Sequence, residues 1–175
     1  MNACESILGL SPYQGGKPIE ELERELGIKN VIKLASNENP LGASLKVVEA
    51  IKLSLKDAHR YPDGNGYELK RAISQHLDVA LEMISLGNGS NELLELIARV
   101  FVCKNTDEVI FSQYAFVVYP LVTQALGATA KVAPAKDYSH DLNAMLELIN
   151  DNTKLIFIAN PNNPCLLYTS PSPRD

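Results

Sequence analysis

Residues 155–164 have the sequence Leu-Ile-Phe-Ile-Ala-Asn-Pro-Asn-Asn-Pro, and this stretch decides how the rest of the chain is interpreted. Its first five residues are apolar and predict a buried strand, Leu155–Ala159. The two Asn-Pro steps that follow favour extended backbone and end that strand in a turn. Ligands of α/β sheets bind beyond the carboxyl ends of the strands, so the Asn163 amide stands where it could donate to a phenolate oxygen. An ordinary turn asparagine before proline is the alternative.

Residues 165–175, Cys-Leu-Leu-Tyr-Thr-Ser-Pro-Ser-Pro-Arg-Asp, break this pattern, since they neither open a helix nor continue a strand. We interpret this tail as foreign or misjoined sequence and expect it to lack stable packing against the residues before it. The chain up to Pro164 is then the front of a longer protein.

The composition is that of a globular protein able to bury one ordinary core, with 175 residues, 46% hydrophobic and 21% charged. The formal net charge is −5 and no basic block stands out, which argues against nucleic acid or an anionic membrane as a partner. The amino terminus lacks the basic start of a signal peptide, and no apolar stretch approaches the ~20 residues that span a bilayer. Three widely spaced cysteines show no metal-binding spacing and suggest a reducing compartment. We therefore expect a cytoplasmic protein.

The first half of the chain shows mostly helical spacing, with loops dense in turn-forming residues. The predicted elements are a helix over Pro18–Leu26 ended by Gly27, a short strand over Val31–Ala35, a helix capped by Ser44 with Leu45, Val48, Ile51 and Leu55 on its apolar face, a loop over Arg60–Gly66 and a helix marked by Leu69, Ile73 and Leu77.

From residue 83 onward strands alternate with helices, which predicts an α/β fold with a mainly parallel sheet and flanking helices. The predicted strands are Met83–Leu86, Val109–Phe111, Ala130–Ala133 and Leu155–Ala159, and the predicted helices are one with Leu93, Leu94, Ile97, Ala98 and Phe101 on one face, one over Tyr114–Leu126 ended by Gly127, and one capped by Asp141.

A glycine-rich loop, Gly87-Asn88-Gly89-Ser90-Asn91-Glu92, joins the first of these strands to its helix. The glycines let the backbone approach a ligand closely, and free amides at the helix start, together with the Ser90 hydroxyl, suit a phosphate. A tight turn with an ordinary Ser or Asn cap is the alternative, because short glycine loops are weak evidence on their own.

Aromatic residues follow the next strand and also lie in two loops. Phe116, at the carboxyl end of the sheet, could stack on a flat heterocycle, although its spacing from Tyr119 favours packing in a helix core. Tyr13 and Tyr61 lie in proline-flanked loops, where they either contact another chain or a substrate, or cover a helix end. The three histidines, His59, His76 and His140, show no metal spacing and are predicted to be surface or structural residues.

Taken together and in this order, these pieces resemble the amino-terminal half of the histidinol-phosphate aminotransferases, which are pyridoxal-phosphate enzymes of the aspartate-aminotransferase fold group. The resemblance covers roughly Leu8–Pro164. It rests on Tyr-Gln-Gly-Gly-Lys-Pro at 13–18, Ser-Asn-Glu-Asn-Pro-Leu-Gly at 36–42, Arg-Tyr-Pro at 60–62, the glycine loop at 87–92, the aromatic stretch at 114–119 and Asn-Pro-Asn-Asn-Pro at 160–164.

The resemblance implies a partial large domain of a fold-type I pyridoxal-phosphate enzyme together with an N-terminal arm. We expect residues 1–40 to form the arm and a small-domain segment, residues 41–164 to form the first part of the cofactor-binding domain, and residues 165–175 to be the non-native tail. The implied reaction transfers an amino group between glutamate or 2-oxoglutarate and imidazole-acetol phosphate, the oxo partner of histidinol phosphate, in histidine biosynthesis.

The same resemblance assigns roles to residues of this chain. Pyridoxal 5'-phosphate would be held at its phosphate by Gly89, Ser90 and Asn91, stacked by Phe116 and bound at its phenolic oxygen by Asn163. Tyr61 would reach the cofactor of the partner subunit in a homodimer, and Tyr13, Asn37 and Asn39 would border the substrate pocket.

The sequence departs from the family pattern after Pro164, where the family continues with Thr-Gly and this chain has Cys165-Leu166. The family's Schiff-base lysine typically follows a Ser-x-x-Lys pattern, and none of the eleven lysines here has a serine three residues before it. Because that lysine anchors the cofactor and moves a proton, we expect this polypeptide to be inactive. Two alternatives remain: another small pyridoxal-phosphate aminotransferase or related decarboxylase, and a non-catalytic α/β module that holds a phosphorylated ligand.

Overall fold

The computed structural model describes residues 3–168 and divides the chain into two compact units. The first unit combines the chain up to Tyr13 with the chain from Ser85 onward, and the second unit runs from Gln14 to Ile84. The domain boundaries expected from the sequence, after residues 40 and 164, stay a prediction.

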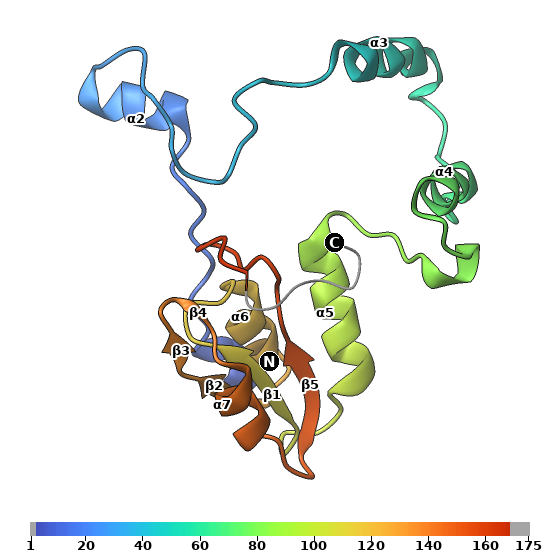
Figure 1. Cartoon of the computed structure of the whole chain (residues 1–175). Coiled ribbons are helices and arrows are strands. Elements are labelled where there is room, and N and C mark those ends of the chain that lie inside the picture. The colour runs from blue at the N-terminus through green and yellow to red at the C-terminus, as the bar shows by residue number, and fades with distance from the viewer. Residues whose placement is uncertain (1–2, 169–175) are drawn as a thin grey trace. The chain divides into compact units, whose positions relative to one another are not determined.

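A parallel three-stranded sheet of order β2-β1-β5 forms the centre of the first unit (Figure 1). The middle strand, β1 (Glu108–Ser112), pairs with β2 (Thr129–Ala133) on one side and with β5 (Thr153–Phe157) on the other. Since all three strands run in the same direction, their carboxyl ends share one edge of the sheet. This confirms the α/β fold and the three later strands of the predicted series, with β5 ending two residues earlier than expected.

Helices pack against both faces of the sheet. Successive side chains of β1 point to opposite faces, and each set packs against helices. Val109 and Phe111 join Phe157 in a cluster that the helices α5 and α6 cover. Ile110 points the other way and packs with Met145 of α7. Burial on both faces explains the continuous apolar run in this strand. The helices of this unit are α1 (Glu5–Leu8), α5 (Ser90–Phe101), α6 (Val118–Ala125) and α7 (Leu142–Glu147).

One predicted helix cap is confirmed and one predicted helix start is wrong. The Asp141 side chain accepts hydrogen bonds from the backbone N–H groups of Asn143 and Ala144, which confirms the predicted cap of α7. The predicted start of α6 at Tyr114 is wrong, because the helix begins at Val118 and Tyr114 has a φ of 59°. Pro120 explains the shift: in the first turn it loses no helical hydrogen bond, whereas an earlier start would put it in the helix interior.

A short hairpin that sequence patterns did not predict follows β2. It pairs β3 (Ala135–Lys136) with β4 (Ser139–His140) in antiparallel fashion. Its two central residues, Asp137 and Tyr138, have φ values of 50° and 64°. Positive φ at both positions is the geometry of a type I′ turn, which ordinarily favours Asn-Gly and therefore left no signal here.

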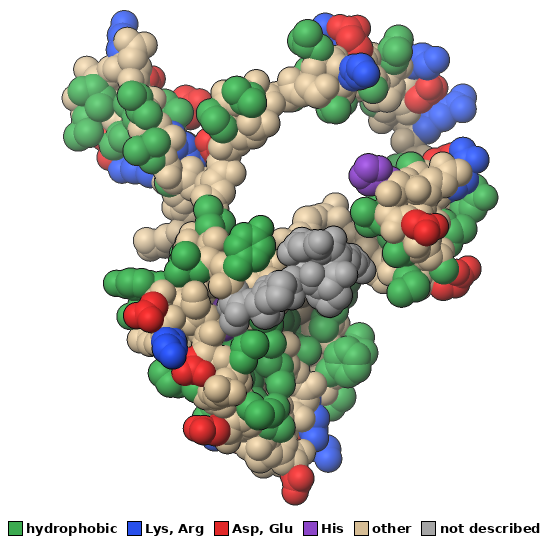
Figure 2. Space-filling view, viewed as in Figure 1, with side chains coloured by type: hydrophobic (Ala, Val, Ile, Leu, Met, Phe, Trp, Pro, Cys, Tyr) green, Lys and Arg blue, Asp and Glu red, His purple; other side chains and the backbone are tan. Residues whose placement is uncertain are grey.

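The second unit consists of helices joined by irregular segments. Gly27 adopts the left-handed conformation and ends α2, as predicted. The helix after Ser44 is also confirmed, although the Ser44 side chain makes no capping hydrogen bond. No residue of its three α-helices is buried, and hydrophobic side chains lie at the surface around α2 and α3 (Figure 2). The elements are α2 (Ile19–Leu26), α3 (Leu45–Ser54), η1 (Leu55–Asp57), α4 (Tyr67–Leu77) and η2 (Leu81–Met83).

The two strands predicted before residue 87 are wrong. Val31–Ala35 is irregular, with Ile32 and Leu34 exposed at 83% and 93%. Met83 ends the 3₁₀-helix η2, and Ile84–Leu86 continues without strand pairing. Mainly apolar segments become strands only when another strand satisfies their backbone groups, and the described residues supply no such partner for either segment.

The carboxylate of Asp107 organises the connection from α5 to β1. One of its oxygens accepts the backbone N–H groups of Cys103 and Lys104 at 2.8 and 2.9 Å, and the residue is only 4% exposed. These two bonds hold the pKa of the Asp107 carboxyl below its usual value, and the bond from Cys103 makes the larger contribution.

We expect Asp107→Ala to lower the thermal midpoint of the first unit at neutral pH, because two backbone donors lose their acceptor. A carboxyl with a depressed pKa stabilises the fold above its unfolded pKa, and the effect disappears as pH falls through the folded pKa. The wild-type and Asp107→Ala unfolding curves should therefore converge in acid. Thermal unfolding followed by circular dichroism from about pH 7 to about pH 2 measures this. Asp151→Ala, which alters an exposed carboxylate in the same unit, is the matched control; an equal shift in both variants would contradict the prediction.

No helix within residues 3–168 is long and apolar enough to cross a membrane.

Candidate functional site

The loop before α5 leaves the start of that helix open. Gly89 is the N-cap residue, with φ 80° and ψ 175°, and as a glycine it has no side chain to form a capping hydrogen bond. The carboxylate of Glu92 accepts the backbone N–H of Asn88 at 2.6 Å, which ties the loop back to the first turn. A Cβ built on Gly89 would meet nothing within 4 Å, so open space lies beside this residue at the start of the helix. Free amides and the positive end of the helix dipole make this an anion-binding geometry.

The turn after β1 carries Phe116. Its ring is half-buried and meets the ring of Tyr119 edge to face, with centroids 6.0 Å apart and an interplanar angle of 88°. Burial raises the pKa of the Tyr119 phenol, which remains protonated at neutral pH. The Phe116 ring therefore packs against an uncharged aromatic side chain of the core, that of Tyr119.

The segment after β5 carries Asn163, which is half-buried, and beside it a residue that sequence reasoning missed. Asn162 is fully buried, and its Nδ2 donates to the Tyr114 carbonyl at 3.4 Å. This bond links the turn after β5 to the turn after β1. A run of Asn and Pro residues predicts an exposed turn from the sequence, so only the fold shows that Asn162 is buried.

Three buried polar atoms have no hydrogen-bond partner among residues 3–168: Ser112 Oγ, His140 Nδ1 and Asn162 Oδ1. Ser112 ends β1, His140 belongs to the hairpin after β2, and Asn162 follows β5. Each sits at or beyond the carboxyl end of a sheet strand. Buried polar atoms without partners are unusual in folded proteins, so their concentration at this edge is consistent with a site that binds a polar ligand.

The remaining predicted site residues are spread over both units. Tyr13, in the first unit, is 55% exposed. Tyr61, Asn37 and Asn39 belong to the second unit, where the Tyr61 side chain is completely exposed. Asn37 has a φ of 48°, and the Asn39 amide bonds within its own turn, donating to the Gly42 carbonyl and accepting from the Leu41 N–H.

The loop that carries Tyr61 is tied to the start of α4 by the carboxylate of Asp63. This carboxylate accepts the backbone N–H groups of Tyr67 and Asn65 at 2.9 and 3.0 Å. These two bonds hold the pKa of the Asp63 carboxyl below its usual value, and the bond from Tyr67 makes the larger contribution. Asp63 therefore caps α4 and fixes the chain two residues after Tyr61.

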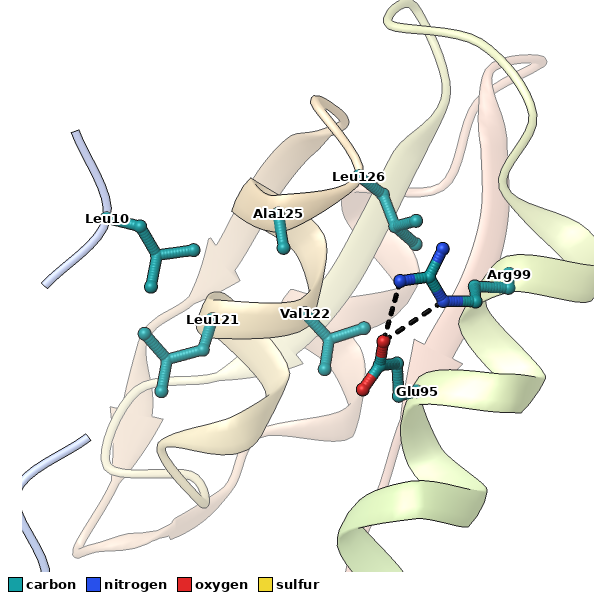
Figure 3. Close-up of a pocket in the computed structure, with 7 residues that line it drawn as sticks. All are labelled: Leu10, Glu95, Arg99, Leu121, Val122, Ala125 and Leu126. Atoms are coloured by element: carbon teal, nitrogen blue, oxygen red, sulfur yellow. Dashed lines mark hydrogen bonds and ion pairs between the residues drawn. The ribbon is translucent and has the colours of Figure 1, made fainter. Parts of the chain in front are cut away.

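A pocket of about 190 Å³ lies between α5 and α6 (Figure 3). Its two charged residues, Glu95 and Arg99, form an ion pair at 2.7 Å within α5, and none of the predicted site residues lines it. Apart from that pair it offers no titratable group, so we assign it no chemistry. It is lined by Leu10, Glu95, Arg99, Leu121, Val122, Ala125 and Leu126.

Comparison with known proteins identifies the class. The family model for aminotransferases of class I and II matches residues 29–170, and the chain belongs to this family. It is a homologue of histidinol-phosphate aminotransferases. It is 60% identical over 162 residues to histidinol-phosphate aminotransferase 1 of Mannheimia succiniciproducens and 58% identical over 163 residues to that of Idiomarina loihiensis. Both matches cover 93% of this chain and 44% of the relative, so the chain spans less than half the length of these curated relatives.

The fold agrees with this family. The crystal structure of histidinol-phosphate aminotransferase from Sinorhizobium meliloti in complex with pyridoxal-5'-phosphate superposes with a TM-score of 0.80 at 27% identity, covering 91% of this chain and 42% of that one. The structure of aspartate aminotransferase from Thermotoga maritima, at 24% identity and a TM-score of 0.73, supports the fold alone. The expected fold-type I α/β architecture of pyridoxal-phosphate aminotransferases is thereby confirmed.

Proposed function

We propose that this chain is the amino-terminal part of an aminotransferase that moves an amino group between glutamate and imidazole-acetol phosphate, with pyridoxal 5'-phosphate as cofactor. The observation that carries the proposal is the 60% identity to a histidinol-phosphate aminotransferase across 93% of the chain. The roles of individual residues follow from the geometry of the first unit and from the motifs that resemble the family.

The start of α5 fits the cofactor phosphate. Its N-cap residue, Gly89, has no capping side chain and open space beside it, which suits a tetrahedral anion, and Ser90 and Asn91 are both exposed there. We assign Gly89, Ser90 and Asn91 to bind the phosphate through backbone amides and the Ser90 hydroxyl.

Phe116 and Asn163 follow β1 and β5, whose carboxyl ends share the same edge of the sheet. We assign the Phe116 ring to stack against the pyridine ring and the Asn163 amide to donate to the phenolic oxygen. When bound, pyridoxal phosphate supplies an electron sink for bonds at the α-carbon of the amino acid. The contribution of these side chains is to hold and orient that ring.

Three further assignments concern the complete protein. Tyr61, fully exposed in a loop fixed by Pro62 and Asp63, is proposed to contact the cofactor phosphate of a partner subunit in a homodimer. Tyr13, Asn37 and Asn39 are proposed to border the substrate pocket.

Residues 165–175 are proposed to be foreign to the protein. Within that tail Leu166 and Tyr168 are 60% and 65% exposed, but Cys165 is half-buried and its thiol donates to the Tyr138 carbonyl at 3.2 Å. Leu166 and Leu167 also form backbone hydrogen bonds with Asn162, so the start of the tail packs against the residues before it, contrary to expectation. Residues 169–175 lie outside the described part.

The test is to extend the coding sequence beyond Pro164 in its natural frame and to assay the product. We expect pyridoxal-phosphate-dependent transfer from histidinol phosphate to 2-oxoglutarate by that product, and no transfer by the 175-residue chain, in which no lysine has the Ser-x-x-Lys spacing. Borohydride reduction of the 175-residue chain mixed with the cofactor should label no single lysine preferentially.

Other outcomes separate the alternatives. Preference for an aromatic amino acid, or release of carbon dioxide, would replace the substrate assignment while keeping the family. Tight cofactor binding by the extended protein without any transfer would favour a non-catalytic module. Specific labelling of one lysine in the 175-residue chain would overturn its proposed inactivity.

A further inference from the structure

The β3–β4 hairpin touches both turns that carry the proposed cofactor contacts. At one end, the Ala135 N–H donates to the Gln113 side chain at 3.4 Å, and the ring of Tyr138 meets that of Tyr114 with centroids 5.3 Å apart. At the other end, His140 Nε2 lies 2.9 Å from the carbonyl oxygen of Ala159. Gln113 and Tyr114 belong to the turn after β1, and Ala159 directly precedes the turn after β5. The hairpin therefore bridges the two turns.

His140 is the buried element of this bridge, with 4% of its surface exposed. A carbonyl oxygen only accepts hydrogen bonds, so Nε2 carries the hydrogen and donates it to Ala159. Nδ1 has no partner within residues 3–168. A buried polar atom without a partner is destabilising, so space filling alone does not explain a histidine at this position. The bond to Ala159 is the contribution that an apolar side chain could not make.

The bond acts beyond the sheet. The pairing of β5 with β1 ends at Phe157, two residues before Ala159. The asparagine turn starts at Asn160, the residue after Ala159. A donor fixed on the hairpin thus restrains the chain between the last paired residue and Asn163.

We propose that His140 is a positioning residue that holds the turn over residues 160–163 so that Asn163 meets the phenolic oxygen of the cofactor. The inference deepens the proposed function and rests on it for the identity of the ligand. The restraint on the turn is independent of the ligand and is measurable without it.

The test compares three variants of the full 175-residue chain. His140→Met fills a similar volume without a donor, His140→Gln keeps an amide donor near the position of Nε2, and His76→Met alters an exposed histidine as the control. In the protein alone, backbone amide hydrogen exchange is measured for residues 158–163. With pyridoxal 5'-phosphate added, the dissociation constant is measured by absorbance titration.

We expect His140→Met to accelerate exchange in residues 158–163 while the amides of β1 keep their protection, and to weaken cofactor binding about tenfold, equivalent to ~1.4 kcal/mol. His140→Gln should restore both, and His76→Met should match the wild type. Unchanged exchange over 158–163 in His140→Met, or equal loss of protection across β1, would overturn the positioning role. Absence of cofactor binding by the wild-type chain would count against the phosphate site assigned at the start of α5, while the exchange result would still decide whether His140 holds the turn.

Discussion

Phe157→Ala should remove a large part of the free energy of unfolding of the first unit. Phe157 is 7% exposed and stacks on Tyr119 with centroids 4.4 Å apart and rings within 4° of parallel. The same cluster includes Val109 and Phe111 of the central strand, so the substitution opens a cavity beside the sheet. Removing a buried phenylalanine side chain typically costs about 3–5 kcal/mol, and whole domains are stable by only about 5–15 kcal/mol.

The measurement is urea unfolding followed by circular dichroism, and Phe101→Ala is the matched control. Phe101→Ala removes the same side chain at a position that is 55% exposed, so it should lower the free energy of unfolding by less than about 1 kcal/mol. Similar unfolding midpoints for the two variants would show that the aromatic cluster does not carry the stability of this unit.

Gly89→Ala should abolish most of the phosphate affinity that we assign to the start of α5. The backbone of Gly89, with φ 80° and ψ 175°, lies in a region that is essentially restricted to glycine, and forcing another residue into it costs about 1–3 kcal/mol. A Cβ at this position meets no neighbour within 4 Å, so the effect is conformational and not a clash. The loop should relax away from this geometry, and the first-turn amides should no longer converge on one anion.

Titration of the chain with pyridoxal 5'-phosphate measures the effect, with a loss of more than about tenfold in affinity expected. Gly64→Ala is the control, since Gly64 has neither a left-handed φ nor a neighbour within 4 Å of a built Cβ. An affinity for Gly89→Ala equal to that of Gly64→Ala would place the phosphate elsewhere.

The identity of this chain is more apparent from its motifs than from its shape. The glycine loop before α5, the aromatic stretch after β1 and the asparagine turn after β5 each lie next to an element that local patterns predict correctly. Loop motifs of this kind depend on residue type and order, which a sequence displays directly. The roles of the residues within them stay predictions until binding is measured.

The sequence by itself determined several helices and the three strands of the parallel sheet. The helix after Pro18, the cap at Asp141 and the apolar run of β1 depend on contacts within a few residues or on simple burial, so their signals are local. Only the tertiary structure decided which apolar runs became strands, because pairing needs a partner that is distant in sequence. Val31–Ala35 and Met83–Leu86 have no such partner among the described residues, whereas β1 has one on each side. Tertiary structure also buried Asn162 and joined His140 to Ala159, since a polar side chain becomes a core contact only when another segment covers it.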